Sequence, residues 1–473
     1  MNDVPFDCYD TVAQMRGAFA EHPERESGDG SLIFALALRA RPGLVAALLD
    51  QSFSRPLATS STGDEVEETV YFRANDPEAF EFLGIGSAVR LRLLSDRPFE
   101  EAASYLCAAR VIASAELRPF VRFFGGGAFD PRREHDERCW INFGSGTLIL
   151  PRVLYIQGKC SAAFVVVGTR DELNQSLALL ERVLAVDPSV QPALNTALTV
   201  LGRRDSVEPD VWSTILGTAQ AEMLEGRLAK VVTARRVTYQ LSEAPRLSGI
   251  IERLKETTTD STIFALRLGA KVFLGATPET LVSRLDRAVY TEALAGTQAI
   301  PRDGCGPDMG GALLSSAKDR REHQFVVEAI HEVLGPLCDR LEVPQVPAVR
   351  ALRRMIHLHT AITGELHTKV HIVQLVAQLH PTPAVGGVPR DVALDFISVQ
   401  EPVERGWYAA PFGWCTPEGD GHFVVALRSA LLSGDKAHLY AGAGIVRGSD
   451  PGLEYEETEL KMSSILNALG LAS

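Results

Sequence analysis

The sequence predicts an α+β fold. Segments of strand character and segments of helical periodicity follow one another without the regular strand–helix–strand alternation that marks a parallel α/β protein. Of the 473 residues, 46% are hydrophobic and 23% are charged, a balance typical of a globular protein with one large domain or two. No repeat and no compositional bias toward disorder interrupts this pattern, so we expect an extensive apolar core.

The first part of the chain, residues 1–205, alternates short apolar runs with turn residues. The runs at 32–38, 120–124 and 162–168 predict strands, and the apolar periodicity of 172–185 predicts a helix. Glycines follow the second of these runs. They lack the Lys-Ser/Thr pair of a phosphate-binding loop, so we expect a tight structural turn there.

A short polar stretch at 201–209 precedes the second part, and we place the boundary after residue 205. Strands are predicted in residues 206–473 at 230–239, 261–268, 271–274, 423–432 and 437–442. Helices are predicted at 211–225, 318–341 and 372–379. A last helix begins at Ser449-Asp450-Pro451 and continues toward the end of the sequence.

Charge and cysteine usage exclude several classes of protein. The formal net charge of −13 disfavours nucleic acid and anionic membranes as partners. The N-terminus has no basic region before an apolar segment, and no apolar run is long enough to span a membrane, so we expect a cytoplasmic protein. The seven cysteines are scattered and form no Cys-x-x-Cys motif, which predicts reduced thiols and no zinc site.

Two predicted helices carry acidic side chains three or four residues apart, a spacing that places them on one helix face. The C-terminal helix presents Glu454, Glu457 and Lys461, and the helix near residue 318 presents Asp319 and Glu322 beside Lys318. One such pair is ordinary on a solvated helix face. Two pairs together are able to hold one Mg²⁺ ion, which takes one or two carboxylates and leaves sites for water and an anionic substrate.

Nine sequence blocks occur in order in the second part: KVVTAR at 230–235, FLGATPE at 273–279, EALAGT at 292–297, KDRREH at 318–323, HPTPAVGG at 380–387, RGWY at 405–408, VALRS at 425–429, AGAGIV at 441–446 and EYEET at 454–458. Together they resemble the chorismate-utilising enzymes, and within them the isochorismate synthases, over roughly residues 215–473. The resemblance implies two stacked, largely antiparallel β-sheets ringed by helices. It also implies that residues 206–473 form the chorismate-binding catalytic part, while residues 1–205 are a variable part that contributes to the scaffold.

The resemblance implies an Mg²⁺-dependent isomerisation, in which water attacks C2 of chorismate while the C4 hydroxyl leaves. By this resemblance Lys230 is the base for water and Glu279 the acid for the leaving group. We expect Arg235 and the metal ion to lie near Lys230, where positive charge disfavours its ammonium form. Thr277 stands where the motif more usually has Ser, and it keeps the hydroxyl.

The remaining site residues also follow from the resemblance. Glu322 and Glu457 are the expected direct ligands of Mg²⁺, and Asp319 and Glu454 their outer or water-mediated partners. The groups expected to bind the substrate are Arg428, Tyr408, Lys461, His357, Thr297, Gly296 and the backbone N–H groups of Gly442 and Gly444. Glu456 and Glu459 are expected to be solvated.

Three readings of the reaction remain open at this point. Ala295 stands where aminodeoxychorismate synthases have a nucleophilic lysine, so water attack is expected here. Residues 379–387 resemble isochorismate synthases more than anthranilate or salicylate synthases, whereas His422 and Thr233 depart from the common pattern. We expect a monomeric isochorismate synthase; a salicylate synthase and a chorismate-binding protein without turnover are the alternatives. The product's destination, whether menaquinone, a catechol siderophore or salicylate, stays open.

Overall fold

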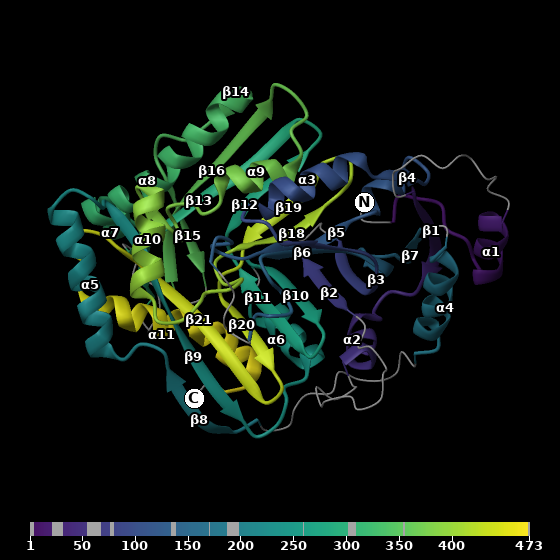
Figure 1. The fold of residues 1–473 in the computed structure, drawn as a ribbon, viewed down its shortest axis with the longest axis horizontal. Helices are drawn as coiled ribbons and strands as arrows, with labels where there is room; N and C mark the ends of the chain where they lie inside the picture. The colour runs from purple at the N-terminus through teal and green to yellow at the C-terminus, as the bar shows by residue number, and fades with distance from the viewer. Residues whose placement is uncertain are drawn as a thin grey trace.

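The computed structural model shows how the chain is arranged (Figure 1). The residues that it describes are 4–20, 32–53, 68–75, 80–133, 139–169, 171–186, 198–258, 260–300, 309–352 and 355–471.

Helices and strands are distributed over the whole length of the described chain. The α-helices are α1 Val12–Ala20, α2 Val45–Phe53, α3 Pro98–Ala108, α4 Leu173–Leu184, α5 Pro209–Leu224, α6 Leu247–Thr257, α7 Met309–Ser315, α8 Ala317–Leu334, α9 Ile372–Leu379, α10 Arg390–Gln400 and α11 Pro451–Leu469. The short 3₁₀ helices are η1 Arg118–Phe120 and η2 Gly335–Leu337. The strands are β1 Leu32–Ala40, β2 Thr69–Arg73, β3 Glu81–Leu93, β4 Arg110–Ile112, β5 Phe123–Gly127, β6 Gly146–Gln157, β7 Ala162–Gly168, β8 Val200–Asp205, β9 Lys230–Leu241, β10 Thr262–Leu268, β11 Lys271–Thr277, β12 Thr280–Leu285, β13 Ala288–Ala299, β14 Cys338–Glu342, β15 Ala348–Leu352, β16 Met355–Leu366, β17 Gly387–Val388, β18 Pro411–Cys415, β19 Gly421–Val425, β20 Ser429–Ser433 and β21 Lys436–Ile445.

The strands form two layers that share one long strand. The first layer runs β8–β9–β21–β20–β11–β10–β2–β3–β6–β7–β1–β4, and the second runs β6–β5–β18–β19–β12–β13–β16, with β14 and β15 both paired to β16. β6 belongs to both layers, because its end 153–157 pairs with β7 and its start 146–149 pairs with β5. Of the named strand pairs in the described residues, only β1 with β4 is parallel. The predicted α+β class with largely antiparallel sheets is confirmed.

The larger apolar core lies between the two layers. Phe264 of the first layer stacks on Phe412 of the second with ring centroids 4.6 Å apart, and both are fully buried. A second apolar cluster covers the opposite face of the first layer, where Leu48, Ile251 and Met462 come from α2, α6 and α11. Because both faces of the first layer pack against apolar side chains, its strands carry apolar residues at adjacent positions and not only at alternate ones.

Helices cover the outer faces and fix the position of the site. α8 packs against β13, α9 against β12, and α11 against β21 (Figure 1). Strand β8, at the end of the predicted first part, pairs with β9 along 200–205, so the stretch at 201–205 is sheet rather than linker. The division at residue 205 itself stays a prediction.

Three predictions about local structure are wrong. The glycines after 124 form no turn: Gly125 and Gly126 lie inside β5, where an added Cβ would come 2.0 Å from the Thr147 carbonyl and 2.2 Å from that of Pro411. The predicted helix 318–341 ends at Leu334, and its last residues form η2 and β14. The predicted strand 423–432 is two strands, separated at Arg428 by a backbone φ of 48°.

Two further expectations concern membranes and cysteines. In the part of the chain that the structure describes, no helix combines the length and apolarity that crossing a bilayer requires. No disulfide joins the cysteines of the described residues, in line with the expected reduced thiols. Cys305 lies outside the described residues.

Candidate active site

One cavity gathers nearly all of the residues predicted to form the site. It measures about 890 Å³ including its open mouth, and it lies between β9 and β21 of the first layer and β13 and β16 of the second. The predicted residues that line it are Glu279, Gly296, Thr297, Asp319, Glu322, His357, Tyr408, Arg428, Gly442, Gly444, Glu454, Glu457 and Lys461. Lys230 is fully buried directly behind this lining, where a Cβ added to Gly444 would come 3.5 Å from its Cε.

Capped helix starts place the acidic residues. The Ser316 hydroxyl accepts a hydrogen bond from the backbone N–H of Asp319 at the start of α8 and donates one to the Asp319 carboxylate. The Asp450 carboxylate accepts one from the N–H of Leu453 at 3.0 Å, and Pro451 occupies the first turn of α11. Because a cap determines where a helix begins, it also determines which side chains of the first turns face the cavity.

Three lysine–carboxylate pairs surround the cavity. Lys230 Nζ lies 3.1 Å from Glu322, Lys318 Nζ 3.0 Å from Glu454, and Lys461 Nζ 2.6 Å from Glu457. Each pair joins a carboxylate predicted to hold metal to a cation of the protein itself. The carboxylates from α8 and α11 thus share one cavity although they are more than a hundred residues apart in sequence.

The acidic side chains affect one another through their charges. Burial raises the pKa of Asp319, and the charges of Glu322 and Glu457 raise it further. Burial likewise raises the pKa of Glu454, with Glu457 adding to the effect against the charge of Lys318. Several carboxylates close enough to repel one another are the environment that a divalent cation stabilises.

The oxygen-only donor set therefore fits Mg²⁺ in its chemistry. Among the described residues, no group of three or more His, Cys, Asp or Glu side chains is arranged closely enough to enclose a metal ion. Mg²⁺ does not require such a group, because it commonly keeps several waters and takes one or two protein carboxylates. Glu322 and Glu457 remain the predicted direct ligands.

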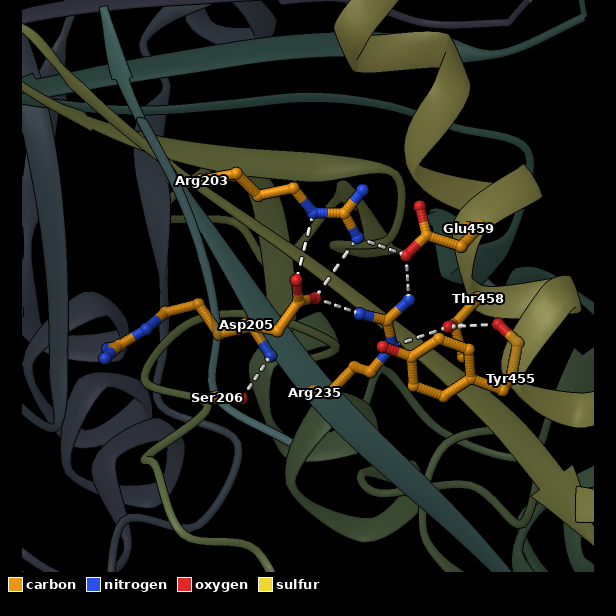
Figure 2. A network of polar contacts seen from close by, with 8 residues as sticks. Arg203, Asp205, Ser206, Arg235, Tyr455, Thr458 and Glu459 are labelled. Atoms are coloured by element: carbon orange, nitrogen blue, oxygen red, sulfur yellow. Dashed lines mark hydrogen bonds and ion pairs between the residues drawn. The ribbon is translucent and has the colours of Figure 1, made fainter. Parts of the chain in front are cut away.

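The environment of Lys230 differs from the prediction in one respect. Arg235 is five positions further along β9 and therefore on the opposite face of the strand. Its guanidinium donates to Thr458 at 2.8 Å, to Asp205 at 2.5 Å and to Glu459, and it lies 3.9 Å from the ring centroid of Tyr455 (Figure 2). The expectation that Arg235 acts beside Lys230 is wrong.

The same network also corrects the prediction for Glu459. This carboxylate was expected to be solvated, but it is only 35% exposed and bonds both Arg203 and Arg235 (Figure 2). Glu456, in contrast, is exposed as expected. The helical periodicity of 3.6 residues correctly predicted that both side chains point away from the cavity. It could not show that a strand packs against the face of α11 that carries Glu459.

Glu279 is held at the junction of β11 and β12. The Thr277 hydroxyl donates to the Val425 carbonyl at 2.6 Å and accepts from the Glu279 N–H at 3.3 Å, which explains how Thr serves in place of Ser. Burial raises the pKa of Glu279 to about 8, and the charge of Glu292 adds to the effect against Lys230 and Lys461. The carboxyl is therefore largely protonated at neutral pH.

Groups suited to binding a carboxylate lie along the remaining wall. Burial lowers the pKa of Arg428 to about 10, so it stays charged at neutral pH. Burial raises the pKa of Tyr408 to about 12, so its phenol stays a hydrogen-bond donor. Lys461 donates to the Gly442 carbonyl at 2.9 Å, and a Cβ on Gly442 would come 3.4 Å from the Tyr408 oxygen.

His357 and its neighbours form the floor of the cavity. Thr297 Oγ1 lies 3.1 Å from His357 Nδ1, while the buried Nε2 has no hydrogen-bond partner in the described residues. Burial lowers the pKa of His357 well below its usual range, so the ring is neutral. Gly296 has a φ of 76° and a Cβ there would come 3.1 Å from the Asp319 side chain, so glycine is required.

Sequence reasoning missed two buried charged groups next to the site. Arg405 lines the cavity but is bound to Glu401 and to the carbonyls of Val232 and Val385, which indicates a structural role. Glu292 is buried in β13 beside Glu279. Both belong to the blocks that carry the family resemblance, and a charged residue inside an apolar strand was a signal available for Glu292.

The positions that depart from the common pattern lie in different places. Ala295 lines the cavity and offers no nucleophile. His422 is half-buried in β19 with its ring 5.9 Å from that of Phe72, and burial lowers its pKa to about 4. Thr233 lies on the face of β9 opposite Val232, away from the cavity. Of these three positions, only Ala295 lines the cavity.

Sequence comparisons link the chain to known proteins. It matches the family described as "Chorismate binding enzyme" over residues 34–470. A protein of Pseudomonas aeruginosa named "Salicylate biosynthesis isochorismate synthase" is 37% identical over 440 residues, which covers 91% of this chain and 90% of that protein. "Isochorismate synthase MenF" of Bacillus subtilis is 32% identical over 378 residues, 79% of each chain.

Solved structures agree with the sequence comparisons. The menaquinone-specific isochorismate synthase MenF from Escherichia coli superimposes with a TM-score of 0.77 at 26% identity, covering 98% of this chain and 99% of that one. Anthranilate synthase component I from Streptococcus pneumoniae superimposes with a TM-score of 0.66 at 19% identity and shares the fold.

Proposed function

The chain belongs to the chorismate-binding enzymes, and from this premise we propose that it is an isochorismate synthase, an isomerase that converts chorismate to isochorismate. The relatives named as isochorismate synthases support this activity over most of the chain. The composition of the cavity supports it independently, because it combines a proton donor, a lysine and cationic groups around a space suited to a small dianion.

The single observation that carries the proposal is the state of Glu279. A hydroxyl that leaves C4 as water needs a proton, and a carboxylate with an ordinary pKa has none to give at neutral pH. Burial raises the pKa of Glu279 to about 8 and thereby keeps a donor in the cavity. Glu279 delivers this proton to the C4 hydroxyl as its bond to carbon breaks.

Lys230 provides the complementary step. In its neutral form the amine accepts a proton from the water that attacks C2, and the gain of one proton by Lys230 balances the loss of one by Glu279. Lys230 Nζ is buried, and although it lies 3.1 Å from Glu322 it makes no hydrogen bond there. It is therefore available to a water molecule entering the cavity.

The substrate's carboxylates are bound by the opposite wall. Arg428 supplies a planar cation, Tyr408 a phenol donor and Lys461 a second cation. The backbone of Gly442 and Gly444 borders the cavity where β21 extends beyond the end of its pairing with β20. Holding both carboxylates fixes the ring between Lys230 and Glu279, and orientation of this kind contributes much of the rate in a bound reaction.

Glu322 and Glu457 hold Mg²⁺ in this proposal, with Asp319 and Glu454 orienting them. A Mg²⁺ ion held there would neutralise the charge of a substrate carboxylate. Lys230 Nζ and Lys461 Nζ lie 3.1 Å and 2.6 Å from these same two carboxylates.

The expected product is isochorismate, with salicylate at most a slow by-product. Ala295 provides no amine for covalent attack, which leaves water as the nucleophile. Elimination of pyruvate would require a second reactive pose of the same ring, and small changes of pose cost a large part of the rate.

Purified protein incubated with chorismate and Mg²⁺, with the products resolved by HPLC, tests the proposal. We expect isochorismate in equilibrium with chorismate. Stoichiometric salicylate and pyruvate would establish a salicylate synthase instead, and unchanged chorismate would establish a binding protein without turnover.

A further inference from the structure

Glu292 is a buried carboxylate that stands next to the cavity without lining it. Its side chain is 3% exposed, and four groups bind its carboxylate through hydrogen bonds or ion pairs. These are the Thr280 backbone N–H at 2.7 Å, His359 Nε2 at 2.7 Å, Arg350 at 3.0 Å and the Tyr290 hydroxyl at 3.2 Å. A buried carboxylate with this many donors is ionised and fixed in place.

The bond to Thr280 has a direct consequence for Glu279, the preceding residue. β12 pairs with β13 only through residues 283–285, so the N–H of Thr280 lies beyond the end of that ladder. The pairing of β12 with β19 also shifts register between Thr280 and Val282. The Glu292 side chain therefore takes the place of a strand partner where β12 begins, and it fixes the backbone that carries Glu279.

The charge of Glu292 acts on the Glu279 carboxyl as well. Burial alone would raise the pKa of Glu292, but hydrogen bonds from His359 and Thr280 and the charge of Arg350 outweigh burial and hold its pKa below the usual range. The charged groups that face Glu279 are thus Glu292 on one side and Lys230 and Lys461 on the other. Of these three charges only that of Glu292 favours the protonated form, and it adds to burial, which is the larger cause.

We propose that Glu292 is a positioning residue for Glu279: its carboxylate fixes the start of β12, next to Glu279, and places a negative charge beside the Glu279 carboxyl. The inference rests on the proposed function, since it takes Glu279 to be the proton donor. It assigns to Glu292 a part in proton transfer although Glu292 does not contact the cavity.

Replacement of Glu292 by Gln removes the charge but keeps an oxygen that accepts from Thr280. Activity that depends on a protonated Glu279 is lost as pH rises through its pKa. Without the charge of Glu292 this alkaline limb of the kcat/KM profile should move to lower pH, by about one unit for a close like charge. The loss of activity in Glu292→Gln should accordingly be several-fold greater at pH 8 than at pH 6.

Two further variants separate charge from packing. Glu292→Asp keeps the charge but shortens the reach to Thr280, so we expect a lower rate with the alkaline limb unshifted. Glu81→Gln is the matched control, because Glu81 is a buried carboxylate bound by Tyr71 at 2.6 Å and Lys255 at 3.1 Å on β3, away from the cavity. It should leave the profile where it is in the wild type.

An alkaline limb of Glu292→Gln that superimposes on that of the wild type would overturn the inference. Wild-type activity in Glu292→Asp would overturn the positioning role, and this variant decides the matter if Glu292→Gln does not fold by circular dichroism. Carboxyl ¹³C NMR of protein labelled at glutamate, with the Glu279 signal assigned by its absence in Glu279→Gln, measures the shift without turnover. A shifted Glu279 titration in protein that leaves chorismate unchanged would refute the proposed function and retain the role of Glu292.

Discussion

The two faces of β9 hold two fully buried cations in opposite circumstances. Arg235 on one face bonds Thr458, Asp205 and Glu459 and lies against the ring of Tyr455 (Figure 2). Lys230 on the other face has one carboxylate 3.1 Å away and no hydrogen bond in the described residues. Buried polar groups are nearly always satisfied in structural positions, and exceptions occur at functional sites.

The two faces are connected through α11. Tyr455, Thr458 and Glu459 contact Arg235, whereas Glu457 and Lys461 of the same helix line the cavity. A helix fixed to β9 on one side is thereby held at a set distance from Lys230 on the other. The hydrogen-bonded cluster, composed of Arg235, Arg203, Asp205, Thr458 and Glu459, thus helps to position the cavity face on which Lys230 lacks a hydrogen bond within the described chain.

The largest effect is expected from substitutions in the cavity, and it should appear in the rate of turnover. Lys230→Ala and Glu279→Ala should each lower chorismate turnover by roughly 10²- to 10⁴-fold, because each removes one proton transfer. Folding should be nearly intact, which circular dichroism of the same samples would show. Turnover within a few-fold of wild type in either variant would remove that residue from the mechanism.

The second largest effect is expected from a substitution of Arg235 on the opposite face of β9, and it should lower the stability of the fold. Arg235→Leu leaves Asp205 and Glu459 with Arg203 as their remaining cation and removes the donor to Thr458. We expect the free energy of unfolding to fall by about 3 kcal/mol, the low end for breaking a buried ion pair. Urea unfolding followed by circular dichroism measures it.

Arg203→Ala is the control for that measurement. Arg203 bonds the same two carboxylates, but its side chain is 41% exposed. We expect a loss of at most about 1 kcal/mol, as for exposed pairs in general. Equal losses in the two variants would show that burial of Arg235 contributes nothing, and the contrast between the faces of β9 would fail.

The smallest effect concerns the metal. Glu457→Gln replaces a charged oxygen by a neutral amide, so the Mg²⁺ concentration for half-maximal activity should rise by about 10-fold or more. Titration of Mg²⁺ into EDTA-treated enzyme measures it, and exposed Glu456→Gln on the same helix is the control. Full activity of the wild type without divalent metal would eliminate the proposed ion.

The sequence by itself determined the α+β class, most of the helices and strands, and the set of residues to examine. Helix 372–379 was predicted at the bounds that α9 has, because its apolar periodicity and its ends are local properties. The spacing of Glu454, Glu457 and Lys461 likewise placed them on one helix face without any knowledge of neighbours.

Only the tertiary structure decided what each charged residue faces. Arg235 is a buried cation with several hydrogen-bond partners, whereas Lys230 is a buried cation without one among the described residues. This difference depends on which helix or strand from elsewhere in the chain packs against each residue. The tertiary structure also decided the role of Gly125 and Gly126, which allow neighbouring strands to approach closely instead of forming a turn. It likewise showed that the chain between β19 and β20 is interrupted at Arg428. Local propensity describes a segment alone, whereas burial and partners arise from contacts between segments distant in sequence.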